Sequence, residues 1–153
     1  MSASRKQSGG AAAGAAMLAL AIAAMSVPAS AEVLFERGNI YAVVNNPPNV
    51  SSFTLDRPAH ISVITTYHWN DARGSTPGTV ALMNAAGDMF GPWQATGGTG
   101  QGGVPNAYWI VRPETVLPAG EYDVIDSEVE TWSHNPQSNG AGMVKVEGRK
   151  LAR

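Results

Sequence analysis

The run from Ala59 to Asn70 constrains the fold more than any other part of the chain, because β-branched and aromatic residues alternate through it without a Gly or Pro. At the two-residue period of a β-strand this run has two faces. The face that we expect to meet the core holds Ile61, Val63, Thr65, Tyr67 and Trp69, and the face of mixed polarity holds His60, Ser62, Ile64, Thr66 and His68. A turn-forming stretch, 70–74, follows, so the strand should end at a rim where loop residues are available for binding.

Turn signals recur about every eight to twelve residues in the rest of the chain, and no window after the first 31 residues has a helical period. We therefore predict an all-β fold, a single antiparallel β-sandwich or jelly-roll-like domain of about eight short strands. Two hairpins are expected, one joining 33–36 to 39–44 and one joining 80–82 to 89–94. The predicted inner faces hold Phe53, Leu55, Ile61, Val63, Val80, Leu82, Ile110, Val124 and Val146.

The first 31 residues have the pattern of a secretory signal peptide. Arg5 and Lys6 precede an apolar, alanine-rich segment, 11–27, and Ala29-Ser30-Ala31 supplies a small-x-small cleavage pattern. The apolar part is shorter than the roughly 20 residues that a membrane-spanning helix needs. We expect cleavage after Ala31 and a bacterial protein that is periplasmic or extracellular, with no membrane anchor left. The absence of cysteine excludes both a disulfide framework and a lipid-modified cysteine.

The remaining chain has the size of one ordinary domain, which we place at 32–148, followed by a basic tail, 149–153. The sequence has ten Lys and Arg against twelve Asp and Glu, and removal of the leader takes away two of the basic residues. Binding to nucleic acid requires a basic stripe, and the only basic cluster is in the tail. Nucleic acid is therefore excluded as a partner.

Motifs for nucleotide binding and for hydrolysis are not supported. Gly98 to Gly103 matches the spacing of a dinucleotide fingerprint, but a β-like run follows it where that motif requires a helix. No serine, cysteine or zinc hydrolase signature is present. Asp126, Glu128 and Glu130 alternate, so they could act as an acid and base pair on one strand face. A solvated acidic loop is the favoured interpretation, because the stretch 127–139 is rich in turn residues and needs no buried carboxylate.

Metal binding has only weak support in the sequence. His60, His68 and His134 could bind a transition metal together with Asp71 or Asp126, but no pair has ligand spacing. A structural calcium ion, held by Asp and Asn oxygens, is possible in a secreted β-sandwich. No other cofactor is expected.

The four tryptophans favour a binding site. Each is predicted to lie at a strand end or in a loop beside polar residues, and a sugar or peptide site combines flat apolar rings with amide or imidazole groups. The alternative is that they are structural, each with its indole N–H satisfied by a loop carbonyl. The candidate ligand-binding residues are His68, Trp69, Asn70, Trp93, Asn106, Trp132 and His134.

Several segments resemble a recurrent extracellular domain of bacterial and archaeal secreted proteins, distantly similar to pre-peptidase C-terminal β-sandwich modules. They are Thr66-Tyr67-His68-Trp69-Asn70, Pro77-Gly78-Thr79, Gly91-Pro92-Trp93, the run from Gln101 to Trp109, Leu117-Pro118-Ala119-Gly120-Glu121-Tyr122, Asp126-Ser127 and Thr131-Trp132-Ser133-His134-Asn135. The resemblance covers nearly the whole chain after the leader. It implies an exported β-sandwich and brings no catalytic residues.

Three functional hypotheses follow from these observations. The first is a non-catalytic module that binds a glycan or another cell-surface ligand through the candidate residues above. The second is a structural envelope or extracellular domain, and the third is a hydrolase that uses Asp126 with His68 or His134. We also predict that the segments around Trp69 and Trp132 meet at one end of the sandwich, because each places a histidine and an asparagine beside its tryptophan.

Overall fold

Short strands joined by turns form the protein in the computed structural model, which describes residues 30–152. The strands are β1 (Glu32–Arg37), β2 (Val44–Asn45), β3 (Ser52–Leu55), β4 (Ala59–Tyr67), β5 (Thr79–Asn84), β6 (Met89–Gln94), β7 (Thr96–Gly98), β8 (Tyr108–Val111), β9 (Thr115–Leu117), β10 (Gly120–Asp126), β11 (Ser133–His134) and β12 (Val144–Lys150). Three single turns of 3-10 helix complete this part of the chain: η1 (Gln101–Gly103), η2 (Val129–Thr131) and η3 (Pro136–Ser138). The prediction of an all-β fold is confirmed. The proposed signal peptide lies almost entirely outside the described residues.

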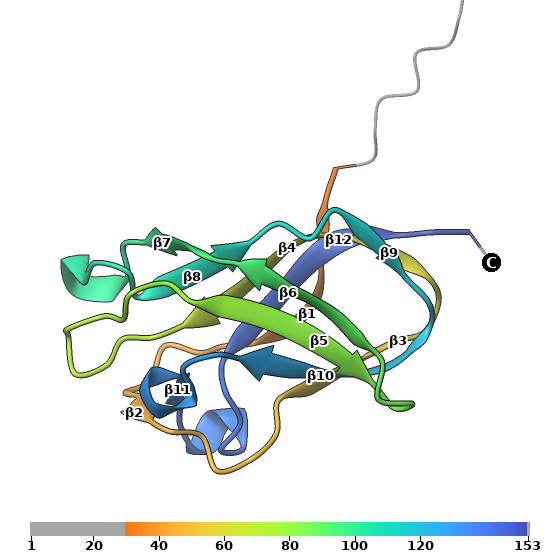
Figure 1. The fold of residues 1–153 in the computed structure, drawn as a ribbon. Helices are drawn as coiled ribbons and strands as arrows, with labels where there is room; N and C mark the ends of the chain where they lie inside the picture. Colours follow the sequence, from red (N-terminus) through yellow and green to blue (C-terminus); the bar gives the residue numbers. More distant parts are fainter. Residues whose placement is uncertain (1–29, 153) are drawn as a thin grey trace, which may run out of the picture.

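Two antiparallel sheets lie face to face (Figure 1). The six-stranded sheet has the order β1-β12-β4-β8-β7, with β9 pairing to the first residues of β4. The four-stranded sheet has the order β3-β10-β5-β6, and β2 pairs with β11 in a small ribbon at one end. No helix within residues 30–152 has the length and apolar character needed to cross a bilayer.

The core lies between the two sheets and contains side chains from both. Its buried members include Phe53, Leu55, Ile61, Ile64, Val80, Leu82, Trp109, Val111, Leu117, Tyr122, Val124, Trp132, Val144 and Val146. Seven of the nine predicted inward residues are among them, and the other two, Val63 and Ile110, are only half-buried. Both exceptions lie on the outer face of the six-stranded sheet, one on β4 and one on its neighbour β8.

A β-bulge in β4 explains why the predicted core face of this strand is wrong. Ile61 pairs with Gly148 and Val63 pairs with Glu147, so β4 advances by two residues where β12 advances by one. Beyond this extra residue the two faces of the strand exchange. Ile64 and every second residue after it in β4 therefore point into the core. A β-carbon at Gly148 would lie 2.0 Å from the carbonyl oxygen of His60, so the close approach of the strands requires glycine there.

Two other sequence predictions need correction, while one is confirmed. The hairpin of β5 and β6 forms as expected. However, β1 pairs with the last strand, β12, rather than with residues 39–44, which run through bends to the short strand β2. The predicted basic tail is also shorter than expected, because Arg149 and Lys150 belong to β12. Lys150 pairs with Asp56 at 3.2 Å, so the folded domain continues past 148.

Candidate functional site

A buried polar cluster occupies the end of the sandwich where β4 and β10 finish. The Nε2 atom of His68 lies 2.7 Å from Oδ2 of Asp126, and neither side chain is exposed to solvent. Thr66 donates to the same carboxylate oxygen at 2.9 Å, and the backbone N–H of Glu128 donates to the other at 2.8 Å. Asp126 therefore accepts hydrogen bonds at both oxygens, as a buried carboxylate must if its desolvation is to be offset.

The cluster continues through hydroxyl groups toward the loops. Nδ1 of His68 lies 2.8 Å from the Thr131 hydroxyl, which in turn lies 3.0 Å from the Ser75 hydroxyl. The His68 ring also stacks on Trp109, with 3.8 Å between the ring centroids. These contacts connect η2 and the loop after β4 to the sheet, so the cluster fixes two loops at this end of the molecule.

The segments around Trp69 and Trp132 meet beside this cluster, as the sequence predicts. The backbone N–H of Trp69 donates to the Ser133 hydroxyl at 3.1 Å. Trp132, however, is buried: its indole N–H donates to the Met143 carbonyl at 2.9 Å, and its ring lies against Gly142, where a β-carbon would clash with it. The prediction that His68 and Trp132 belong to an exposed binding rim is therefore wrong, because both are buried.

The remaining predicted rim residues do not form one surface either. Trp93 lies on β6 of the opposite sheet and packs against the core. Asn106 is exposed in a left-handed turn, with φ of 55°. Nε2 of the half-buried His134 lies 3.1 Å from the Asn45 carbonyl, and the side-chain amide of Asn70 donates to the Gly74 carbonyl at 2.9 Å. Only Trp69, which is half-buried, lines a hollow in the surface.

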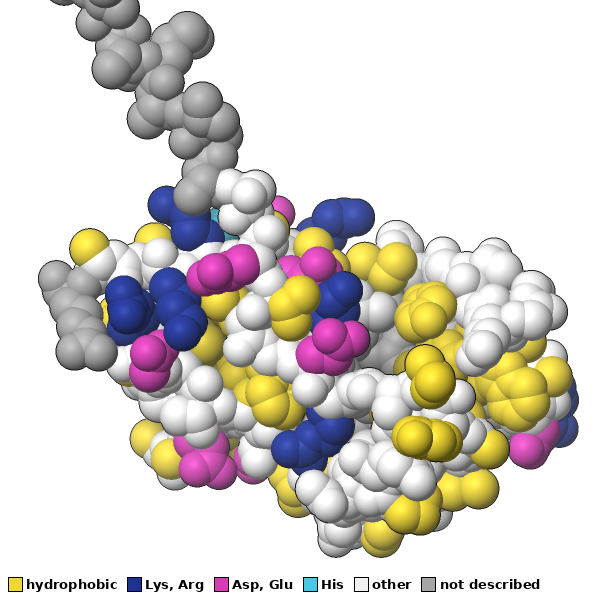
Figure 2. All heavy atoms as spheres, turned by 180° about the vertical axis from the view of Figure 1, so that it is seen from behind, with side chains coloured by type: hydrophobic (Ala, Val, Ile, Leu, Met, Phe, Trp, Pro, Cys, Tyr) yellow, Lys and Arg dark blue, Asp and Glu magenta, His cyan; other side chains and the backbone are white. Residues whose placement is uncertain are grey.

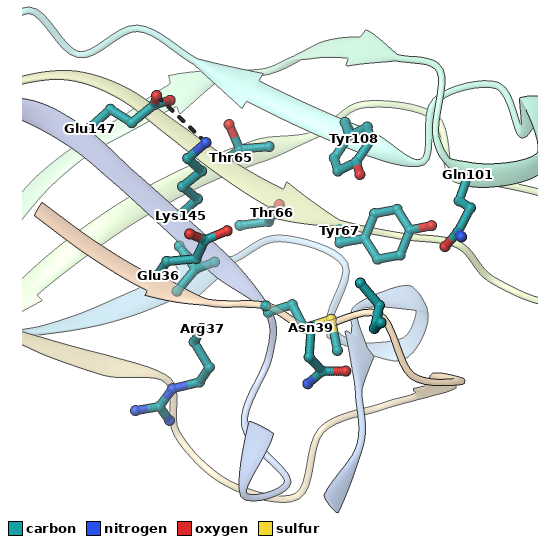
Figure 3. A pocket seen from close by; sticks show the side chains of 14 residues that line it. Glu36, Arg37, Asn39, Thr65, Thr66, Tyr67, Gln101, Tyr108, Lys145 and Glu147 are labelled. Carbon is teal, nitrogen blue, oxygen red and sulfur yellow. Dashed lines mark ion pairs between the residues drawn. The ribbon is translucent and has the colours of Figure 1, made fainter. Parts of the chain in front are cut away.

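That hollow adjoins a larger groove on the outer face of the six-stranded sheet (Figure 3). The groove has a volume of about 570 Å³, within the range of roughly 300 to 1,000 Å³ that is usual for ligand pockets. It is lined by Glu36, Arg37, Gly38, Asn39, Ile40, Thr65, Thr66, Tyr67, Gln101, Tyr108, Met143, Val144, Lys145 and Glu147. These residues come from β1, β12, β4 and β8 and from the loops beside them, so the groove crosses the strands.

Two tyrosines form the aromatic part of the groove. Tyr67 and Tyr108 are cross-strand neighbours on β4 and β8, and their ring centroids are 4.9 Å apart. Tyr108 also pairs with Gly98 on β7, which has no side chain to cover its ring. Burial raises the pKa of the Tyr67 hydroxyl above its usual value of 10.0, and hydrogen bonding from the Gln101 backbone partly offsets the shift. The two rings give the groove a partly open aromatic surface.

The smaller hollow, which we call the apolar recess, has a volume of about 260 Å³ and continues the groove past Tyr67. It lies between the loop 39–43 and the side chain of Trp69, whose indole N–H donates to the Gln101 carbonyl at 3.4 Å. Asn39 fixes this loop through reciprocal side-chain hydrogen bonds with Asn135, of 3.0 and 2.6 Å. Ile40 and Tyr41, at 89% and 60% exposure, stand at the mouth of the recess.

Figure 2 shows the outer face of the six-stranded sheet as a whole. Charged side chains of both signs gather over one half of it, and hydrophobic side chains gather toward the opposite end. The groove is divided in the same way into a charged part and an aromatic part, because Glu36, Lys145 and Glu147 line it together with the two tyrosines. A ligand in the groove would meet charged groups on one side and aromatic groups on the other.

Sequence reasoning missed the groove for a specific reason. The sequence pattern places Tyr67 on the core face of its strand, because local alternation does not reveal the bulge that turns it outward. The signal available was the alternation of Lys145 and Glu147 with Val144 and Val146, which predicts that both charged side chains lie on an outer face. It did not show that Glu36, on β1, lies beside Lys145.

The structure separates the three histidines, which the metal hypothesis required together. Nε2 of His60 lies 3.3 Å from a Glu114 carboxylate oxygen at the surface, while His68 and His134 have the partners given above. Within residues 30–152, no three His, Asp or Glu side chains lie close enough to hold a metal ion. Glu128 and Glu130 do not extend the strand face of Asp126, because they lie next to or within η2 and are exposed. The solvated acidic loop, which the sequence favoured over an acidic strand face, is therefore the correct interpretation of these two residues.

Comparisons of the chain with protein-family models, with curated proteins and with solved structures found no match. The resemblance to a secreted bacterial and archaeal domain therefore stays a prediction.

Proposed function

We propose that the protein is a secreted, non-catalytic β-sandwich module that binds carbohydrate in the groove on its six-stranded sheet. The observation that carries the proposal is the pair formed by Tyr67 and Tyr108, which stand side by side in a groove of ligand size. Export is proposed from the charged and apolar leader and its small-x-small end. The ligand would be a glycan of the cell surface or its surroundings.

The chemistry of the groove supports a sugar ligand. A sugar ring presents C–H groups that pack on an aromatic face and hydroxyl groups that need hydrogen-bond partners. Tyr67 and Tyr108 supply the aromatic faces. The side chains of Thr65 and Gln101 also line the groove, and neither makes a hydrogen bond within the described residues, so both are available to a ligand. This site replaces the loop rim that the sequence predicted. Of the predicted rim residues, only Trp69 lies close to it, in the adjoining apolar recess.

A purely structural role is the second candidate, and the buried tryptophans favour it. Trp109 donates its indole N–H to the Ser75 carbonyl at 3.0 Å, and Trp132 is satisfied in the same way by another carbonyl. Two of the four tryptophans therefore stabilise the fold. They do not explain the groove, which lies on the opposite face of the six-stranded sheet from the core.

Hydrolysis by Asp126 and His68 has weaker support, although the two groups are within hydrogen-bond distance. A catalytic acid or base must reach its substrate, and both side chains are fully buried. Neither residue lines the groove or the apolar recess. The pair has the geometry of a structural cluster that anchors loops.

A glycan-array screen of the protein, followed by titration of the best ligand into Tyr108→Ala, tests the proposal. We expect the variant to bind at least about tenfold more weakly with little change in melting temperature, because Tyr108 is 39% exposed. Ile125→Ala is the matched control, since Ile125 is 37% exposed on the other sheet. Equal binding by Tyr108→Ala and the parent protein would reject the groove. A screen without any bound glycan would favour the structural role.

A further inference from the structure

The charges in the groove point to the class of glycan. Glu36 and Lys145 are direct cross-strand partners on β1 and β12, and Nζ of Lys145 lies 3.7 Å from Oε1 of Glu147. Lys145 is therefore paired with Glu147. Glu36 is exposed and forms no ion pair within residues 30–152. One carboxylate in the groove is left without a cation.

Arg37 does not supply the missing positive charge, although it also lines the groove. Its guanidinium donates to the Ser52 carbonyl at 3.5 Å and lies 5.4 Å from the centroid of the Phe35 ring. Figure 3 shows this side chain directed away from Lys145 and the tyrosines. The charged side chains that face the groove are thus two carboxylates and one ammonium group.

We propose that the groove prefers a glycan that carries protonated amino groups, an amino-sugar oligomer, over neutral and acidic glycans. The inference rests on the proposed carbohydrate-binding function. An ammonium group on the ligand would form a charge-assisted hydrogen bond with Glu36. An acidic sugar would meet an excess of negative charge at the same place.

The spacing of the strands sets the length of this ligand. Glu36 on β1 and Tyr108 on β8 are separated by three strand-to-strand steps, because β12 and β4 lie between them. Neighbouring strands are about 4.8 Å apart, so the two side chains stand on strands separated by about 14 Å. A single sugar ring cannot contact both. The ligand is an oligomer that lies across the strands, with its aromatic contacts on β4 and β8 and its amino group near β1.

Calorimetric titration with three hexamers tests the charge preference: glucosamine, N-acetylglucosamine and galacturonic acid. At mildly acidic pH and low salt, we expect the cationic hexamer to bind about tenfold more tightly than the neutral one and the acidic one to bind most weakly. High salt should reduce this difference, since the charges are accessible to solvent. Glu36→Gln should abolish the preference, so that the cationic and neutral hexamers bind this variant about equally. Glu121→Gln, an exposed carboxylate on the other sheet, is the control and should behave like the parent protein.

The possible results separate this inference from the proposed function. Equal binding of the cationic and neutral hexamers, with no effect of Glu36→Gln, would overturn the charge preference while supporting carbohydrate binding. Tightest binding of the acidic hexamer would also overturn it. Failure of all three hexamers, in a screen where no other glycan binds, would reject both. A melting curve for each variant checks that it is folded. We expect Glu36→Gln to be folded, because Glu36 is exposed.

Discussion

Replacing Asp126 with alanine should destabilise the protein more than any other single loss of a carboxylate in the described chain. The substitution removes the acceptor for the Thr66 hydroxyl, for Nε2 of His68 and for the Glu128 N–H, at 2.9, 2.7 and 2.8 Å. It leaves Nε2 of the fully buried imidazole with only the Thr66 hydroxyl, at 3.3 Å. Breaking a buried pair by removing one member costs about 3 to 5 kcal/mol.

The expected loss for Asp126→Ala is therefore about 4 kcal/mol, a large part of the roughly 5 to 15 kcal/mol by which such domains are stable. Urea denaturation followed by tryptophan fluorescence measures it, because Trp109 stacks directly on His68. Asp126→Asn should lose less, about 2 kcal/mol, since the amide keeps one acceptor oxygen. The matched control is Asp123→Ala on the same strand, where the half-buried carboxylate has no side-chain partner within residues 30–152. A loss below about 1 kcal/mol for Asp126→Ala would refute the reasoning.

Four further predictions concern other parts of the molecule. Exported protein should begin at Glu32 by mass spectrometry, and retention of the apolar leader would contradict the cleavage prediction. Gly148→Ala should cost about 1 to 3 kcal/mol in a denaturant melt, because its β-carbon would lie 2.0 Å from a carbonyl oxygen of β4; an unchanged melt would disprove the need for glycine. Because burial raises the pKa of Tyr67 in the folded protein, the unfolded state ionises first, so stability should fall as pH rises through about 10 and above. In an ultraviolet titration Tyr67→Phe should therefore remove a late-titrating tyrosine, and loss of an early one would contradict the burial. Trp132→Ala should cost about 3 to 5 kcal/mol, and a smaller loss in thermal unfolding would show that this ring does not support the fold.

The fold was predictable from the sequence because strands and turns are encoded locally. Alternation in β4 and in β10, and turn residues such as those between β5 and β6, identify strands without knowledge of their partners. The pairing of β1 was not predictable in this way. A hairpin is the default for neighbouring strands, and the actual partner, β12, is distant in the sequence.

The site was less predictable, because a non-local feature decides which side chains are exposed. The extra residue at the bulge of β4 is Ser62, whose hydroxyl donates to the Glu147 carbonyl at 3.2 Å across a separation of 85 residues. Nothing in the local alternation marks this position. The contact between the segments around Trp69 and Trp132 was predictable, because the polar residues of the two segments are complementary. It could not show that Trp132 would be covered by the backbone at Gly142.

The end of β4 connects the buried cluster to the groove. Successive side chains of a strand point to opposite faces, so the direction of Thr66 determines that of Tyr67. Thr66 is held inward by Asp126, and His68, just beyond the strand, is held by the same carboxylate. The cluster therefore also fixes Tyr67, which lies between these two residues and lines the groove. If the proposed function is correct, Asp126 is a positioning residue that touches no ligand, and the folded fraction of Asp126→Asn should bind glycan more weakly than the parent protein while Asp123→Ala does not.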